Sequence, residues 1–180
     1  MRTKDSPYVV GLREIPSEGL GRVFDLSGDF ARATLADTEA KPEGARLSAD
    51  VQLMKADDEV LVRGRIEGEL TMVCSRCVGP AQVTLSAPFD VLFLPRDADV
   101  PDDAAEDSEA PDVIPYENEQ IELGEMLREE LLLALPYAPL CSESCKGLCA
   151  NCGKDLNQGP CGCSEVTADD RFAALRNLKV

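Results

Sequence analysis

The chain of 180 residues contains no histidine. Imidazole serves as the general base of serine and cysteine triads and as a ligand in many catalytic zinc sites. Its absence excludes histidine-dependent triads and zinc hydrolase sites built on imidazole. A chain of this length can nevertheless bury its own hydrophobic core, so cross-links are not needed merely to make it fold.

Long apolar runs are also missing. The longest strongly apolar run, Leu131 to Leu135, is far shorter than the roughly 20 residues that cross a bilayer as a helix. The beginning of the chain, MRTKDSPYVVGLREI, has no apolar stretch of the kind found in signal peptides. We therefore expect a cytoplasmic protein with no membrane partner. In that reducing compartment, grouped cysteines indicate metal ligands or redox pairs before disulfides.

Basic residues are scarce, since 18 Lys and Arg stand against 34 Asp and Glu and give a formal charge of -16. This balance is a poor match for broad phosphate binding. Zinc bound by thiolates would make the chain more acidic still. Any contact with nucleic acid therefore needs a local basic patch or a basic partner.

An alternating pattern of apolar and polar residues predicts three long strands. Residues 60–72 place apolar side chains or glycine at even positions and charged side chains at most odd ones, as a strand with one buried face does. Residues 47–53 alternate in the same way, and the turn-like KADDE leads from them into the next strand. A third alternating run covers residues 81–93. The fold class we expect is α+β, with an antiparallel sheet of long strands.

One helix is expected to pack on this sheet and two shorter ones are weaker predictions. The stretch IELGEMLREELLLALP, residues 121–136, carries an apolar stripe and ends in a proline. The stripe consists of Leu123, Met126, Leu127, Leu131, Ala134 and Leu135. A short helix is expected to start near Ser27, and Thr167 followed by Asp170 resembles a capping box for a short C-terminal helix.

Composition divides the chain into a body and a tail. Residues 97–112 carry eight acids and no base, which predicts a flexible acidic loop. We expect residues 1–140 to form the body of sheet and helix, with this loop in it. Residues 141–180 form a zinc-binding tail that ends in the short helix. Residues 8–44 are only weakly patterned.

The eight cysteines form four close pairs, which is the number of ligands needed for two ZnS4 sites. The pairs are Cys74 and Cys77, Cys141 and Cys145, Cys149 and Cys152, and Cys161 and Cys163. A redox dithiol or an iron-sulfur centre is the alternative, although the spacings differ from those of ferredoxins. A catalytic zinc is disfavoured because such sites keep one position open and usually include histidine. The prediction is two structural zinc ions per chain.

Four pairs can combine two by two in three ways, and chain geometry decides among them only as a preference. Eight residues, with two glycines and a proline, separate Cys152 from Cys161, and closing such a loop costs little entropy. The preferred second site is therefore Cys149, Cys152, Cys161 and Cys163, which leaves Cys74, Cys77, Cys141 and Cys145 for the first. A small residue after the second cysteine of a CxxC turn permits a left-handed backbone, as Gly153 does in CANCGK. In CSRCVGP the glycine, Gly79, comes one residue later, so this turn is expected to be the looser one.

Four stretches together resemble the YceD family, the large ribosomal RNA subunit accumulation proteins. They are MVCSRCVGP, ELLLALPYAPLC, CKGLCANCGKDLNQGPCGC and DDRFAALRNL. The resemblance begins near Gly44, and Asp170 stands where the family pattern has proline. It implies a cytoplasmic bacterial factor that is needed for normal synthesis, processing or stability of 23S ribosomal RNA. It also implies no catalytic step, and that the eight cysteines are the metal ligands.

Three classes of function remain open. The first is a non-enzymatic ribosome biogenesis factor that contacts ribosomal RNA or a pre-ribosomal particle and has no small-molecule substrate. Its candidate contact residues are Arg63, Arg65, Arg76, Lys146, Lys154, Arg171, Arg176 and Lys179. The second is an acidic protein-interaction module that holds a basic ribosomal protein during large-subunit assembly. The third is a thiol oxidoreductase in which Arg76 lowers the pKa of Cys74 or Cys77, but no thioredoxin-type strand and helix surround this pair.

Overall fold

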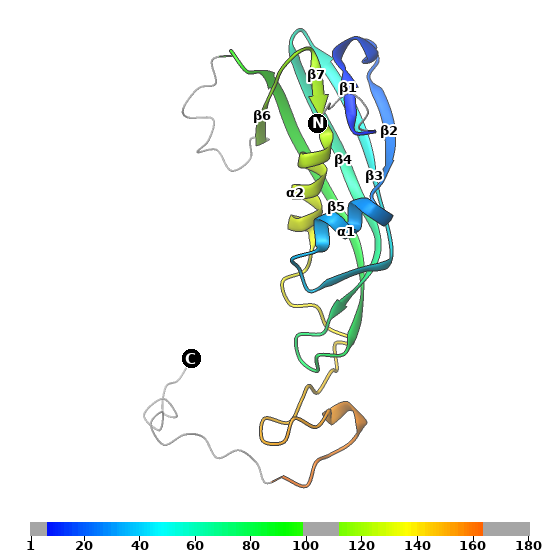
Figure 1. The fold of residues 1–180 in the computed structure, drawn as a ribbon, viewed down its shortest axis with the longest axis vertical. Helices are drawn as coiled ribbons and strands as arrows, with labels where there is room; N and C mark the ends of the chain where they lie inside the picture. Colours follow the sequence, from blue (N-terminus) through cyan, green and yellow to red (C-terminus); the bar gives the residue numbers. More distant parts are fainter. Residues whose placement is uncertain (1–6, 99–111, 164–180) are drawn as a thin grey trace, which may run out of the picture. The chain divides into compact units, whose positions relative to one another are not determined.

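The computed structural model describes residues 7–98 and 112–163, which form two compact units (Figure 1). The first unit comprises Met1–Met72 and Gln82–Tyr137, and the second comprises Val73–Ala81 and Ala138–Val180. Most of the predicted acidic loop lies outside the described residues. The C-terminal helix predicted after Thr167 lies outside them as well.

A five-stranded sheet in the order β2-β3-β4-β5-β6 dominates the chain. Its strands are β2 (Leu20–Asp25), β3 (Ala40–Ala56), β4 (Glu59–Val73), β5 (Pro80–Pro95) and β6 (Asp112–Tyr116). β3 pairs antiparallel with both β2 and β4. A separate two-stranded antiparallel sheet joins β1 (Val9–Gly11) to β7 (Gln120–Glu122).

The three long strands predicted from the alternating pattern are confirmed as β3, β4 and β5. The even positions of β4 face the core, where Val60, Val62, Ile66, Leu70 and Met72 are buried. Side-chain contacts show that β4 and β5 run in opposite directions. Arg63, near the start of β4, contacts Asp90 in the second half of β5, whereas Thr71, near the end of β4, contacts Gln82 near the start of β5. This hairpin is therefore antiparallel as well.

The predicted antiparallel pairing holds for the long strands, but at one edge the short, unpredicted strand β6 pairs with β5 in parallel. β6 has five residues and includes Pro115, which fits an edge strand because proline donates no hydrogen bond to the ladder. The weakly patterned N-terminal region also contains an unpredicted strand, β2, at the opposite edge. Short edge strands carry too few buried positions to show a clear alternation.

Two helices share a single hydrophobic core with the strands (Figure 1). α2 (Leu123–Ala134) is the helix predicted from the apolar stripe, and it buries Leu123, Met126, Leu127 and Leu131. It ends before Pro136, as the sequence indicates. α1 (Gly28–Leu35) begins after Ser27, where the short helix was expected. In the described part of the chain, no helix is long and apolar enough to cross a membrane.

The second unit has very little hydrophobic core of its own. Its described regular structure beyond the strand ends is a single turn of 3-10 helix, η4 (Leu156–Gln158). Its buried cluster consists of Cys74, Ala81 and Cys145, with Leu140 and Cys77 packed against it. Such a cluster buries too little apolar surface to order these segments by itself.

Candidate metal centres

The eight cysteines gather into two groups of four, and in each group the four sulfur atoms lie within 4.8 Å of one another. The first quartet is Cys74, Cys77, Cys141 and Cys145, and the second quartet is Cys149, Cys152, Cys161 and Cys163. These are the combinations that loop length favoured among the three possible ones. Both quartets belong to the second unit.

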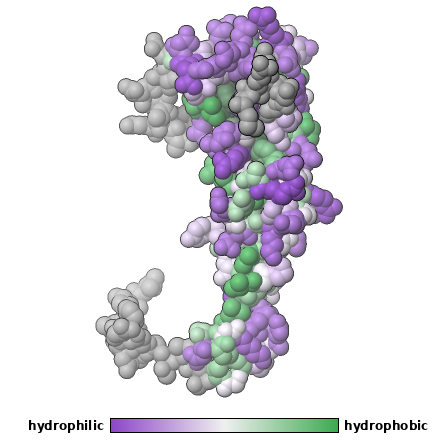
Figure 2. All heavy atoms as spheres, viewed as in Figure 1, coloured by the Kyte–Doolittle hydropathy of each residue, from purple (hydrophilic) through white to green (hydrophobic). Residues whose placement is uncertain are grey.

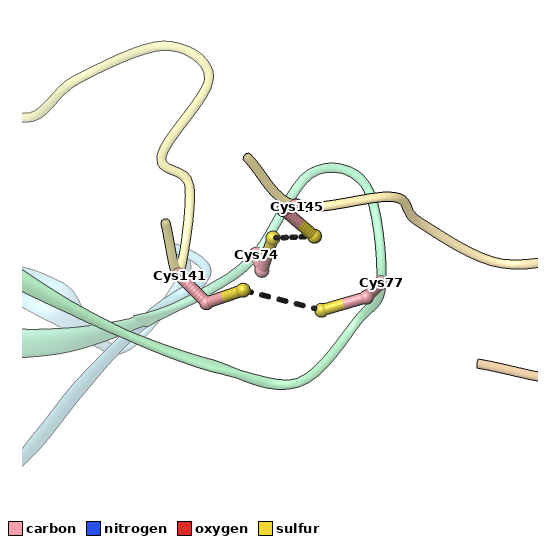
Figure 3. A group of neighbouring side chains, drawn as sticks. All are labelled: Cys74, Cys77, Cys141 and Cys145. Atoms are coloured by element: carbon pink, nitrogen blue, oxygen red, sulfur yellow. Dashed lines mark hydrogen bonds between the residues drawn. The ribbon is translucent and has the colours of Figure 1, made fainter. Parts of the chain in front are cut away.

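The first quartet has the spacing of a tetrahedral metal site (Figure 3). The Sγ atoms of Cys74 and Cys145 are 3.9 Å apart, and those of Cys77 and Cys141 are 3.6 Å apart. Four sulfurs placed 2.3 Å from a tetrahedral zinc ion would be separated by about 3.8 Å. Cys74 and Cys145 are buried, whereas Cys141 is exposed. Either quartet could hold a metal ion such as zinc with all four positions filled by protein sulfur.

The first quartet joins two segments that are distant in sequence, the β4–β5 turn and the chain after Ala138. Backbone contacts accompany the sulfurs, since Ser75 N donates to Pro139 O at 2.9 Å. The Arg76 guanidinium donates to the carbonyl oxygens of Glu143 at 3.2 Å and Cys145 at 3.0 Å. Arg76 therefore holds the loop that presents Cys145.

Glycine is required where the tail passes the β4–β5 turn. Gly147 has a φ of +73°, and a Cβ at this position would lie 2.9 Å from the carbonyl oxygen of Arg76. The next residue, Leu148, donates its amide to that same oxygen at 3.2 Å. Any larger residue at position 147 would meet both backbone strain and a close contact.

The second quartet is built on a tight turn and a returning loop. Gly153 N donates to Cys149 O, and Cys149 N donates to Lys154 O, both at 2.8 Å. Gly153 has a φ of +70°, the left-handed conformation expected for the residue after CANC. Lys154 Nζ donates to Pro160 O at 2.9 Å and so bridges the loop that returns to Cys161.

The turn of the first quartet differs from this pattern. Its left-handed residue is Val78, with a φ of +59°, and not the neighbouring Gly79. Val78 N donates to Cys74 O at 2.9 Å, so the conformation is fixed by the same turn that brings Cys74 and Cys77 together. A β-branched residue is strained in this region because its Cβ substituents crowd the backbone.

One residue that contacts the first quartet, Asn157, was not among the site residues predicted from the sequence. Asn157 donates from Nδ2 to Cys145 Sγ at 3.4 Å, and its Oδ1 accepts from Lys146 N at 2.8 Å. Asn157 lies in the loop between Cys152 and Cys161 of the second quartet. An asparagine in a turn-rich loop is ordinary, so the sequence carries no signal for this contact.

Hydrogen bonds give the thiols within each quartet different acidities. The backbone amide of Cys77 lowers the pKa of Cys74 to about 6, and the amide of Cys152 lowers that of Cys149 to about 6. Hydrogen bonding with Cys145 raises the pKa of Cys141 to about 12. Hydrogen bonding with Cys152 raises the pKa of Cys163 to about 12 in the same way. Without metal, each quartet therefore contains thiolate and thiol side by side.

The predicted basic contact residues of the described chain are divided between the two units. In the first unit, Arg63 is paired with Asp90 through two hydrogen bonds of 2.7 and 3.0 Å. Arg65 donates to Ser86 at 3.1 Å. In the second unit, Lys146 and Lys154 are exposed. Arg171, Arg176 and Lys179 lie outside the described residues.

Comparison with known proteins adds to this geometry. A family model described as "Large ribosomal RNA subunit accumulation protein YceD" matches residues 62–179. An uncharacterised protein of Mycobacterium tuberculosis strain H37Rv is 30% identical over 133 residues, which cover 74% of this chain and 62% of the relative. The "Large ribosomal RNA subunit accumulation protein YCED homolog 1, chloroplastic" of Arabidopsis thaliana is 23% identical over 188 residues, 89% of this chain and 59% of the relative.

The corresponding protein of Zea mays, with the same printed name, is 25% identical over 172 residues, 82% of this chain and 58% of the relative. The chain thus spans about three fifths of the length of the curated relatives that it matches. No solved structure matches it.

We expect the substitution Val78→Gly to strengthen metal binding at the first quartet. Glycine adopts the left-handed conformation freely, and the side chain that is lost is 66% exposed. The substitution relieves the backbone strain but also increases the conformational entropy of the metal-free chain, which opposes binding. The net effect should be zinc binding that is tighter by about 1 kcal/mol, or about fivefold. Competition with a chelator of known affinity measures the difference. The matched control is Val78→Thr, which keeps the branched Cβ; the explanation fails if Val78→Gly and Val78→Thr bind zinc equally tightly.

Zinc binding should weaken as the pH falls from 8 to 6. The thiols of Cys141 and Cys163, with pKa values of about 12, keep their protons at neutral pH in the metal-free protein, and zinc must displace them. Each quartet therefore releases at least one proton, and its affinity should fall at least about tenfold per pH unit. Chelator competition at three pH values, corrected for protonation of the chelator, measures this slope. An affinity that stays constant across the range would contradict the assignment.

Proposed function

Since the chain belongs to the YceD family, whose model matches residues 62–179, we propose that it is a non-enzymatic ribosome biogenesis factor. It supports the synthesis, processing or stability of 23S ribosomal RNA, in the cytoplasm. The family match carries this proposal, and it covers both cysteine quartets. The names of the plant relatives state the role in RNA accumulation, and the proposal extends that role to this chain.

Each quartet binds one zinc ion in this proposal, and the ions are structural. The four-sulfur spacing and the small buried cluster of the second unit support it, because metal binding supplies folding free energy that so few apolar side chains cannot. In zinc-finger peptides this contribution is about 10–16 kcal/mol. All four positions of each ion are taken by cysteine, which leaves none for a substrate and accords with a factor that has no catalytic step.

The second unit is the part of the chain that we propose contacts RNA. It presents Lys146 and Lys154 to solvent, on the two sides of a short ribbon in which Leu148 pairs with Asp155. Zinc would hold this ribbon rigid and so fix where the two ammonium groups lie. The ion-paired Arg63 of the first unit is a weaker candidate, because Asp90 already neutralises it.

A second candidate function is favoured by a groove in the first unit. It has a volume of about 320 Å³, and its lining includes Glu122 and Glu125 beside the side chains of Phe93 and Tyr116. A third carboxylate of the lining, Glu117, is paired with Arg96. Carboxylates around an apolar floor suit an extended segment with lysine or arginine side chains. With the net charge of -16, this groove supports the alternative that the protein holds a basic ribosomal protein during large-subunit assembly.

Reversal of two charges tests the RNA contact. The double substitution Lys146→Glu with Lys154→Glu should weaken binding to purified 23S ribosomal RNA by tenfold or more and reduce the dependence of log affinity on log salt by about one to two. Filter binding at several salt concentrations measures both quantities. The matched control is Lys41→Glu with Lys55→Glu, which makes the same charge change at exposed positions of the first unit.

An unchanged RNA affinity in the Lys146 and Lys154 variant would contradict the proposed contact. Pull-down of the full chain from lysate, with and without nuclease, then separates the two candidate functions. A ribosomal protein that stays bound after the RNA is digested favours the acidic groove. Loss of all bound material after digestion favours contact with RNA.

A further inference from the structure

The loop between Cys152 and Cys161 belongs to the second quartet, yet it also contacts the first. The Nδ2 atom of Asn157 lies 3.4 Å from the sulfur of Cys145 and donates to it. The neighbouring residue, Leu156, donates its amide to Gly147 O at 2.9 Å. The two quartets are thus joined through one side chain and one backbone hydrogen bond.

The position of Asn157 depends on the shape of this loop. Asp155 accepts from Asn157 N at 2.9 Å and from its Nδ2 at 2.8 Å, which orients the amide group. The 3-10 turn η4 has no buried residues, so packing does not hold it in place. The two ends of the loop are ligand positions of the second quartet. Hydrogen bonds from Lys146 N to Asn157 Oδ1 and from Leu156 N to Gly147 O hold the middle of the loop. Closure of the second quartet around a metal would in addition restrain both of its ends.

A donor aimed at a ligating sulfur affects the metal that the sulfur holds. A metal-bound thiolate keeps lone pairs that accept hydrogen bonds, and such a bond stabilises its negative charge and restricts its orientation. Removal of an outer partner of this kind typically lowers metal affinity by about 10–100-fold. The side-chain amide of Asn157 is thus directed at a sulfur of the first quartet, although Asn157 itself lies in the loop of the second quartet.

We propose that Asn157 couples the two centres, so that metal bound at the second quartet strengthens metal binding at the first. The second metal shapes the loop, the loop holds the Asn157 amide on the sulfur of Cys145, and the first metal is retained longer. Since coupling between two binding sites is reciprocal, metal at the first quartet strengthens binding at the second by the same factor. The centres therefore fill together and empty together. This inference rests on the proposed binding of zinc at both quartets.

The test is a double-mutant cycle on zinc release by the full chain. The four proteins are the wild type, Asn157→Ala, Cys161→Ser with Cys163→Ser, and the combination of all three substitutions. Excess chelator removes the zinc, and 4-(2-pyridylazo)resorcinol reports its release. A Cys74→Ser with Cys77→Ser variant shows how fast the second quartet releases zinc when the first is empty, and reciprocity predicts faster release than in the wild type. In the Cys161→Ser with Cys163→Ser variants, the only intact quartet is the first, so the release rate is its own.

We expect Asn157→Ala to release zinc from the first quartet about tenfold faster than the wild type while still binding two ions. The loss of Cys161 and Cys163 should accelerate that release at least as much. Adding Asn157→Ala to this pair should then change the rate less than twofold, because the loop no longer positions the amide. Gln158→Ala is the matched control, because the side-chain amide of Gln158 donates to Asp155 at 3.2 Å and not to a cysteine sulfur, so its loss should leave the rate unchanged.

Asn157→Asp separates donation to sulfur from simple anchoring of the loop. It keeps the oxygen that accepts from Lys146 N but removes both donations from Nδ2, so it should release zinc at least as fast as Asn157→Ala. The coupling is overturned if Asn157→Ala holds two ions and releases them at the wild-type rate. It is also overturned if Asn157→Ala still gives a tenfold effect without Cys161 and Cys163. A wild type that binds no zinc would overturn the proposed metal sites themselves.

Discussion

The second unit depends on the convergence of four sulfur atoms from two distant segments. Cys74 and Cys77 come from the turn between β4 and β5, whereas Cys141 and Cys145 follow α2 in the chain. Among the described residues of this unit, up to residue 163, almost nothing else can offset the entropy of ordering those segments, because the buried cluster is confined to Cys74, Ala81, Cys145 and their immediate neighbours. A metal ion in the quartet is the simplest source of the missing free energy.

The two units are ordered in two different ways. The first unit buries the apolar faces of its long strands and of α2 in one continuous core, and hydrophilic residues cover much of the face that Figure 2 shows. In place of such a core, the described part of the second unit has two cysteine quartets, short backbone hydrogen bonds and a glycine, Gly147, where the tail passes Arg76 closely. The first unit is therefore expected to be insensitive to chelators, whereas the order of the second is linked to metal and to pH.

The parts of the fold that were predictable are those with long repeating patterns. Thirteen or more alternating residues in β4 define its buried face, and the stripe of α2 defines its docking side. β2 and β6 were not predicted because edge strands are short and show too few alternating positions. The parallel pairing of β6 depends on a crossover connection, which local sequence does not encode. For the cysteine quartets, the spacing of the pairs and the length of the Cys152–Cys161 loop favoured the grouping that the structure shows. The strain at Val78 and the contact of Asn157 with Cys145 depend on three-dimensional placement, and no spacing rule reports them.

Native mass spectrometry of freshly reduced protein, before and after acid, tests the central claim most directly. The account predicts a chain that carries two zinc ions under native conditions and loses both in acid, when the thiolates are protonated. The same spectra report the oligomeric state. A chain whose native mass equals that of the polypeptide alone would contradict the account, because the second unit would then be ordered without the ions on which it is said to depend.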